Sequence, residues 1–369
     1  MEENVWYIDN YVDLLEGKQA DKDPLTMEQC AAVAEESLTS RLNAEAMCIG
    51  NIDEKGTREV VDVINRVFIN KSRPLNFAES PGFRSMKLPT RAEAEYIFGS
   101  EVKKELVPVK YQELASSPSE ENNAVEMTLQ FGSDASLGYE GIGILDLIGH
   151  LAYSSAYNQL RTKEQLGYIV SVYTRKTAGS TWGLTMVVQS SSKPPKHLEE
   201  RIEQWLKTFR EELEGKSPEL FATEARGVVV QLMEEDRKLS SEVGSWWNEI
   251  AATEANHDRL KTPSFDRLDK LADELNPTSE GLSDTTLIGS KRKSPEELKE
   301  RVLRMFDQFC ASDSPDRRAI SSRVFSHASK EEYEESLAEP GVLSSYSDMQ
   351  YLKEFLPTWP VVPYWRTTK

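Results

Sequence analysis

The feature that most restricts the fold is a strict alternation of polar and apolar side chains in NNAVEMTLQF, residues 122–131. A period of two places every second side chain on one face of a strand, so the segment predicts a strand lying on a hydrophobic core. Its apolar positions are Val125, Met127, Leu129 and Phe131. Residues 138–160 follow and are apolar on nearly all sides, which is typical of a helix laid across a sheet.

Further strands are expected in the chain both before this strand and after the apolar helix. Short candidates lie upstream, a strand pair follows the apolar helix and one strand comes late in the chain; they cover residues 85–89, 93–99, 105–111, 167–174, 181–191 and 318–328. This order predicts an α+β, two-layer fold in which helices pack on one face of a mostly antiparallel sheet.

Most of the second half is expected to be helical. A single apolar stripe with helical spacing runs through residues 196–215, at Leu198, Ile202, Trp205, Phe209 and Leu213. The tetrapeptide SPEL begins at Ser217 and SPEEL begins at Ser294, and each offers Ser as N-cap, Pro at the first helical position and acids in the first turn. A further amphipathic helix is expected with a stripe at Phe265, Leu268, Leu271 and Leu275.

The first 72 residues have the pattern of the end of a domain. Helices are expected after an N-cap at Thr26 and over residues 59–69, with a short buried strand at residues 45–52 between them. A segment rich in Pro, Ser and Gly follows and marks the best boundary. The predicted organisation is a partial domain at 1–72, a linker at 73–83, a second domain at 84–335 and a C-terminal extension at 336–369.

Charge and apolar content exclude two classes of partner. The net charge of -18 repels a phosphate backbone, and the one basic cluster, at residues 291–293, is expected to be a solvated turn. No window reaches the roughly 18 uninterrupted apolar residues of a membrane span, and residues 1–17 lack the pattern of a signal peptide. Neither nucleic acid nor membrane is expected as a partner, and a cytoplasmic location is predicted.

The sequence shows no catalytic motif of its own. The four histidines, at 150, 197, 257 and 327, lack the spacing of a zinc motif, and His150 is expected to be a buried structural imidazole. The cysteines at 30, 48 and 310 are isolated, which indicates buried or inert thiols. No nucleophile elbow, P-loop or dinucleotide fingerprint occurs. No metal site is therefore predicted within this chain.

One polar motif is left unexplained by these patterns. NQLRTKEQLGYIVSVY, residues 158–173, reads as the end of a helix that feeds a strand, with Arg161 and Tyr168 seven residues apart. Local physics alone allows a structural interpretation, in which Arg161 interacts with the negative end of the helix dipole and Tyr168 packs in the strand.

The motif resembles a signature in the C-terminal half of the insulinase family of zinc metallopeptidases. The similarity extends downstream to VVQSSSKPPKHLEERIEQWL and KLSSEVGSWWNEI and upstream to LTSRLNAEAMCIGNI, and covers about residues 25–330. The family has four homologous domains in two halves that close like a clamshell around a peptide, and the zinc motif lies in the N-terminal half. The resemblance therefore implies a metallohydrolase-like fourth domain preceded by the end of a third.

The resemblance also implies roles for residues of the motif. By motif position, Tyr168 and Arg161 would contact the substrate backbone and stabilise the transition state across the closed chamber. Gln165 and Gly167 would shape the turn that aims Tyr168. Zinc would belong to the complete enzyme and not to this chain. Two departures weaken other family properties: acids stand at Glu234, Glu235 and Asp236 where some members carry a basic, polyanion-binding run, and Ala156 replaces a thiol of some members.

These observations predict the substrate-binding, clamshell-closing C-terminal portion of a zinc metalloendopeptidase that degrades or processes peptides. Its partners would be a peptide substrate and a matching N-terminal, zinc-bearing half, in cis or in trans. The alternative is a non-catalytic scaffold or regulatory subunit of a peptidase complex. Mitochondrial and peroxisomal locations stay open beside the cytoplasmic one, and whether the isolated chain is an enzyme is left open.

Overall fold

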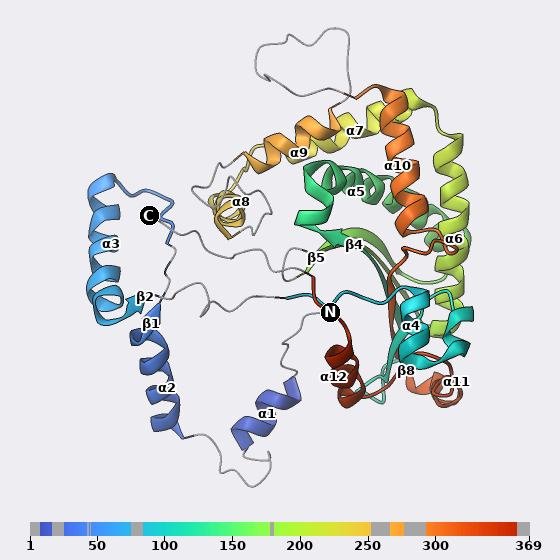
Figure 1. Ribbon diagram of the computed structural model, residues 1–369, viewed down its shortest axis with the longest axis horizontal. Coiled ribbons are helices and arrows are strands. Elements are labelled where there is room, and N and C mark those ends of the chain that lie inside the picture. The colour runs from blue at the N-terminus through green and yellow to red at the C-terminus, as the bar shows by residue number, and fades with distance from the viewer. Residues whose placement is uncertain are drawn as a thin grey trace.

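A mixed six-stranded sheet forms the centre of the protein in the computed structural model (Figure 1). The structure describes residues 8–16, 26–42, 44, 46–74, 84–177, 181–251, 266–276 and 293–359. The strand order is β5-β6-β4-β7-β3-β8. The strands are β3 (Val109–Leu114), β4 (Asn123–Ser133), β5 (Ile169–Thr177), β6 (Thr181–Ser190), β7 (Ala319–Phe325) and β8 (Val342–Leu343).

The expectation of a mostly antiparallel sheet needs correction. β5, β6, β4 and β7 pair antiparallel, but β7 with β3 and β3 with β8 are parallel. β3 and β4 follow one another in the chain and run in opposite directions, but β7 lies between them in the sheet. Because β7 is antiparallel to β4, it is parallel to β3. Long helical connections lead into β7 and β8, and such connections permit parallel neighbours that hairpins do not.

The alternation in β4 places its apolar side chains in the core, as predicted. Val125, Met127, Leu129 and Phe131 are all buried in the main core, against alternate residues of β6 such as Leu184 and Met186. The register pairs Met127 with Met186 and Leu129 with Leu184, which places these side chains on the same face of the sheet. The strand and core-facing positions read from the sequence are therefore confirmed.

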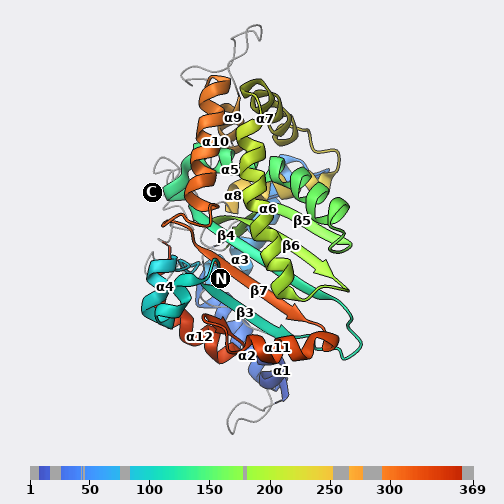
Figure 2. The same cartoon turned by 90° about the vertical axis from the view of Figure 1, so that its right-hand side faces the viewer.

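Helices cover that same face of the sheet (Figure 2). α5 crosses β4, β5 and β6, and α6 crosses β4 and β7. The whole predicted stripe of α6, from Leu198 to Leu213, is buried. The described helices after residue 84 are α4 (Arg91–Phe98), α5 (Asp134–Ala156), α6 (Pro195–Gly215), α7 (Pro218–Leu232), α8 (Leu239–Ala251), α9 (Arg267–Leu275), α10 (Pro295–Phe309), α11 (Lys330–Ser336) and α12 (Tyr346–Phe355).

Hydrogen bonds at the helix starts explain where several helices begin. The Ser217 hydroxyl accepts from the Leu220 N–H at the start of α7, and Ser294 forms a reciprocal capping box with Glu297 at the start of α10. Thr26 forms a capping box with Gln29 as well. All three predicted N-caps are confirmed, since each satisfies backbone donors that a helix start leaves free.

Three predicted strands are wrong. Residues 85–89 form no strand, and Met86 takes part in an isolated bridge with Thr358. Residues 91–98 form the helix α4, because Thr90 and Glu93 make a capping box that outweighs the apolar pattern of the segment. The described residues of 45–52 form no strand and none of them is buried. Phe265, at the start of the expected stripe in α9, lies outside the described residues, whereas Leu271 and Leu275 are buried as predicted.

The N-terminal elements stand apart from the sheet (Figure 1). Neither α2 nor α3 contains a buried residue, and several of their apolar side chains, including Val33 and Val63, are exposed. The elements are α1 (Ile8–Glu16), α2 (Met27–Thr39), β1 (Arg41–Leu42), α3 (Glu54–Val67) and β2 (Arg73–Pro74). The division at 1–72, 73–83, 84–335 and 336–369 stays a prediction.

Buried ion pairs tie α6 to the sheet. The Arg317 guanidinium, at the entry to β7, donates to both carboxylate oxygens of Glu203, and both side chains are almost fully buried. Arg323 of β7 donates to Glu199 at 2.8 Å. Lys293 is also buried and its Nζ donates to Glu274, so its predicted place in a solvated turn is wrong; Lys291 and Arg292 lie outside the described residues.

The substitution Glu203→Gln should destabilise the protein by about 3–5 kcal/mol, because it leaves the Arg317 charge buried without a counter-ion. The matched control is Glu214→Gln on the same helix, whose carboxylate is largely exposed and pairs with Arg210. That control should cost less than about 1 kcal/mol. Urea unfolding measures both free energies, and equal losses would contradict the assignment of a buried pair.

Candidate functional site

The motif singled out in the sequence lies where α5 ends and β5 begins. After Ala156 the helix widens into a π-helical segment, Tyr157–Lys163. The Glu164 N–H donates to the Gln159 carbonyl and the Leu166 N–H to the Leu160 carbonyl, each at 3.0 Å. The order of helix, turn and strand agrees with the prediction. A π-helical turn is rare and is found often at functional sites.

Arg161 and Tyr168 are brought together by this turn. The Arg161 Nη1 donates to the Gly167 carbonyl at 3.0 Å, and its guanidinium lies over the Tyr168 ring at 4.6 Å from the centroid. The same guanidinium lies 5.8 Å from the centre of the Tyr157 ring. Tyr168 is nevertheless 84% exposed. One face of its ring is held by a cation while the side chain as a whole is offered to solvent.

Gln165 and Gly167, which lie between Arg161 and Tyr168 in the chain, have backbone requirements of their own. Gln165 has φ 53°, in the left-handed region that non-glycine residues rarely adopt. A Cβ on Gly167 would lie 1.7 Å from the Gln189 carbonyl oxygen of β6, so no side chain fits there. Together they let the chain reverse out of the helix and approach β6 before Tyr168.

The substitution Gly167→Ala should push the start of β5 away from β6, since the clash is with backbone and cannot be relieved by a rotamer change. We expect a loss of at least about 2 kcal/mol in stability and faster amide exchange at the first residues of β5. Gly227→Ala is the matched control, because a Cβ there meets nothing within 4 Å on α7. It should stabilise the helix by up to about 1 kcal/mol, and similar behaviour of the two variants would contradict the assignment.

Asp146 of α5 places a carboxyl group against β5, where Thr174 hydrogen-bonds to it. Burial raises the pKa of Asp146, on α5, to about 6, although a hydrogen bond from Thr174 of β5 and the charge of Arg267 both act to lower it. The folded protein therefore binds a proton between about pH 4 and 6 that the unfolded chain has released, and ionised Asp146 costs stability above that range.

The substitution Asp146→Asn should raise the melting temperature at pH 7.5, by the equivalent of up to about 3 kcal/mol for a shift of roughly two pKa units. The gain should shrink as the pH falls through 6 and vanish near pH 4, where Asp146 itself is protonated. Asp348→Asn is the control, because hydrogen bonds from Ser344 and Ser345 lower that pKa, so it should bring no gain at pH 7.5. A gain that does not depend on pH would contradict the assigned cause.

Among the residues that the structure describes, the histidines and cysteines do not form a metal centre. His150 is exposed and its Nε2 lies 3.1 Å from a Glu224 carboxylate oxygen, so its predicted burial is wrong. His327 bonds the Ala115 carbonyl, and His257 lies outside the described residues. Cys310 is buried, which raises the pKa of its thiol, whereas Cys30 is exposed. Within the described ranges no three His, Cys, Asp or Glu side chains are gathered as a metal-ion site.

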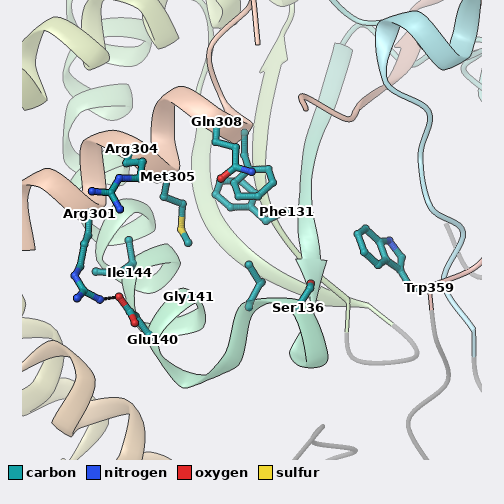
Figure 3. A pocket seen from close by; sticks show the side chains of 12 residues that line it. Phe131, Ser136, Glu140, Gly141, Ile144, Arg301, Arg304, Met305, Gln308 and Trp359 are labelled. Atoms are coloured by element: carbon teal, nitrogen blue, oxygen red, sulfur yellow. Dashed lines mark ion pairs between the residues drawn. The ribbon is translucent and has the colours of Figure 1, made fainter. Parts of the chain in front are cut away.

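A cavity of about 420 Å³ opens elsewhere, between α5 and α10 (Figure 3). None of its lining residues belongs to the motif. Its charged groups are already engaged: Glu140 pairs with Arg301, and Arg304 with Glu300. Sequence patterns gave no sign of this cavity, because its walls come from segments far apart in the chain.

Comparisons with known proteins find similarities in both sequence and fold. Residues 147–247, which contain the motif, match the family described as PQQ synthase PqqF-like, C-terminal lobe domain 4. In fold, the chain is similar to pitrilysin, with a TM-score of 0.64 at 19% identity over 97% of this chain and 31% of that one.

Curated relatives are similar in sequence. The chain is 27% identical to human insulin-degrading enzyme over 290 residues, which is 78% of this chain and 24% of that protein. It is 31% identical to the peroxisomal insulin-degrading enzyme-like 1 of Arabidopsis thaliana over 214 residues, or 58% of this chain and 20% of that protein. The chain is thus a homologue of insulin-degrading enzymes, as the motif indicated, and spans about a quarter or less of the length of these curated relatives.

None of the described helices is both long enough and apolar enough to cross a membrane.

Proposed function

We propose that this chain is the substrate-binding, clamshell-closing C-terminal portion of a zinc metalloendopeptidase. The observation that carries the proposal is the exposed phenol of Tyr168, held on one face by the guanidinium of Arg161 at the end of a π-helical turn. Homology to peptidases supports a peptide as the substrate.

The two side chains supply complementary donors. The phenolic O–H of Tyr168 can donate to the oxyanion that develops when a peptide carbonyl is attacked. Arg161 uses Nη1 for the Gly167 carbonyl, and its planar guanidinium has further N–H groups that can hold a carbonyl of the substrate backbone. Gln165 and Gly167 act by shaping the turn and need not touch the substrate.

The described residues do not fit a catalytic zinc, since no three suitable ligands lie together among them. We therefore propose that the zinc belongs to a matching N-terminal half, in cis or in trans. Donors on one half and the metal on the other make catalysis depend on closure around the peptide.

The substitution Tyr168→Phe tests the catalytic role, because it removes the O–H and keeps the ring under Arg161. In the enzyme completed by its zinc-bearing half, kcat should fall by roughly 10²- to 10³-fold with little change in KM. Tyr173→Phe is the matched control, since Tyr173 is a second exposed tyrosine and lies on β5, which begins directly after Tyr168. An unchanged kcat in Tyr168→Phe would favour the non-catalytic scaffold instead.

A further inference from the structure

Glu164, a residue of the motif, forms an ion pair with Arg201 of α6 that no sequence pattern predicts. The Arg201 Nε donates to the Glu164 Oε2 at 2.6 Å and its Nη2 to the Oε1 at 2.7 Å. The Gln159 side-chain amide also donates to the Oε1, at 2.7 Å. The Glu164 side chain is only 15% exposed. Two parallel bonds from a planar guanidinium fix direction as well as distance.

The pair joins the motif to a rigid part of the core. Arg201 lies on α6, where its neighbour Ile202 is fully buried, whereas Glu164 lies between Arg161 and Gln165 in the turn. The Glu164 N–H also closes the wide π-helical turn by donating to the Gln159 carbonyl. Backbone and side chain of Glu164 are therefore both held.

The turn needs such support. Gln165 follows Glu164 directly and has φ 53°, a conformation that persists only where surrounding contacts enforce it. Tyr168 is too exposed for core packing to fix its direction, so that direction depends on the turn and on Arg161. The Arg201 hydrogen bond holds the pKa of Glu164 below its usual value, so the carboxylate stays charged at neutral pH.

We infer that Glu164 and Arg201 are positioning residues, which fix the π-helical turn so that Arg161 and Tyr168 face the substrate together. This inference rests on the proposed function for its consequence in catalysis. The effect of the ion pair on the geometry of the turn concerns this chain alone, so it can be tested separately from the effect on catalysis. The pair does not touch the substrate; it acts through the geometry of the turn.

The first test needs no activity. A 3-fluorotyrosine placed at position 168 of the chain reports the stacking under Arg161 by its ¹⁹F chemical shift. Arg201→Gln and Glu164→Gln should each move that signal toward the shift of free fluorotyrosine. Arg201→Lys keeps the charge but loses the bidentate fork, so it should move the signal part of the way.

The matched control is a second bidentate pair on the same helix. Arg210 of α6 donates through Nε and Nη2 to the two carboxylate oxygens of Asp307 on α10, away from the motif. Arg210→Gln removes the same groups from the same helix and should leave the ¹⁹F signal unchanged. If the ¹⁹F signal is as unchanged in Arg201→Gln as it is in Arg210→Gln, the inference is wrong.

The second test measures the consequence in the completed enzyme. Arg201→Gln should lower kcat by about tenfold or more with a smaller change in KM, whereas Arg210→Gln should change neither. Because the pair acts as one unit, the double variant Glu164→Gln, Arg201→Gln should be no worse than the poorer single variant. Additive losses, or losses that only follow the folded fraction measured by circular dichroism, would overturn the positioning role.

Tyr168→Phe separates the two proposals. If it leaves kcat unchanged, the proposed function fails, whatever the ¹⁹F signal shows. If it lowers kcat but Arg201→Gln does not, the function stands and the positioning role fails. If both hold, adding Arg201→Gln to Tyr168→Phe should cost less than it does in the parent protein.

Discussion

The packing of α5 across β4, β5 and β6 is the contact on which the site depends. The buried residues of α5 are almost all apolar or glycine, and they pack in the main core against the apolar face of β4. Its position fixes where its C-terminal end meets the sheet. The chain must then pass from helix to edge strand within a few residues, and the π-helical turn, Gln165 and Gly167 accomplish this passage.

Charge is used inside the protein to set orientation. Hydrophobic contact alone permits small rotations of α6 over the sheet, whereas paired guanidinium and carboxylate groups have narrow geometric requirements. Glu199 and Glu203 face Arg323 and Arg317 on the sheet side, and Arg201 faces the turn that carries the motif. One helix therefore relates the sheet to the candidate site, although the pairs themselves carry a desolvation cost.

Local sequence patterns predicted those features that local physics controls. The alternation of β4, the stripe of α6 and the caps at Ser217 and Ser294 depend on neighbours in the chain and were read correctly. The mixed sheet was missed because the insertion of β7 between β3 and β4 depends on contacts between distant segments. Lys293 and His150 were misjudged for the same reason, since burial of a polar side chain depends on which partner the fold supplies.

The motif itself was visible in the sequence, and the resemblance it carries gave Arg161 and Tyr168 their expected roles. The sequence by itself determined the fold class, the core faces of β4 and α6, the helix starts at Thr26, Ser217 and Ser294, and the kind of protein to which this chain is homologous. Only the tertiary structure decided that the Arg161 guanidinium lies over the Tyr168 ring and that Arg201 supports the turn. Those contacts join residues whose approach is set by the packing of α5, α6 and β6, and no local periodicity encodes that packing.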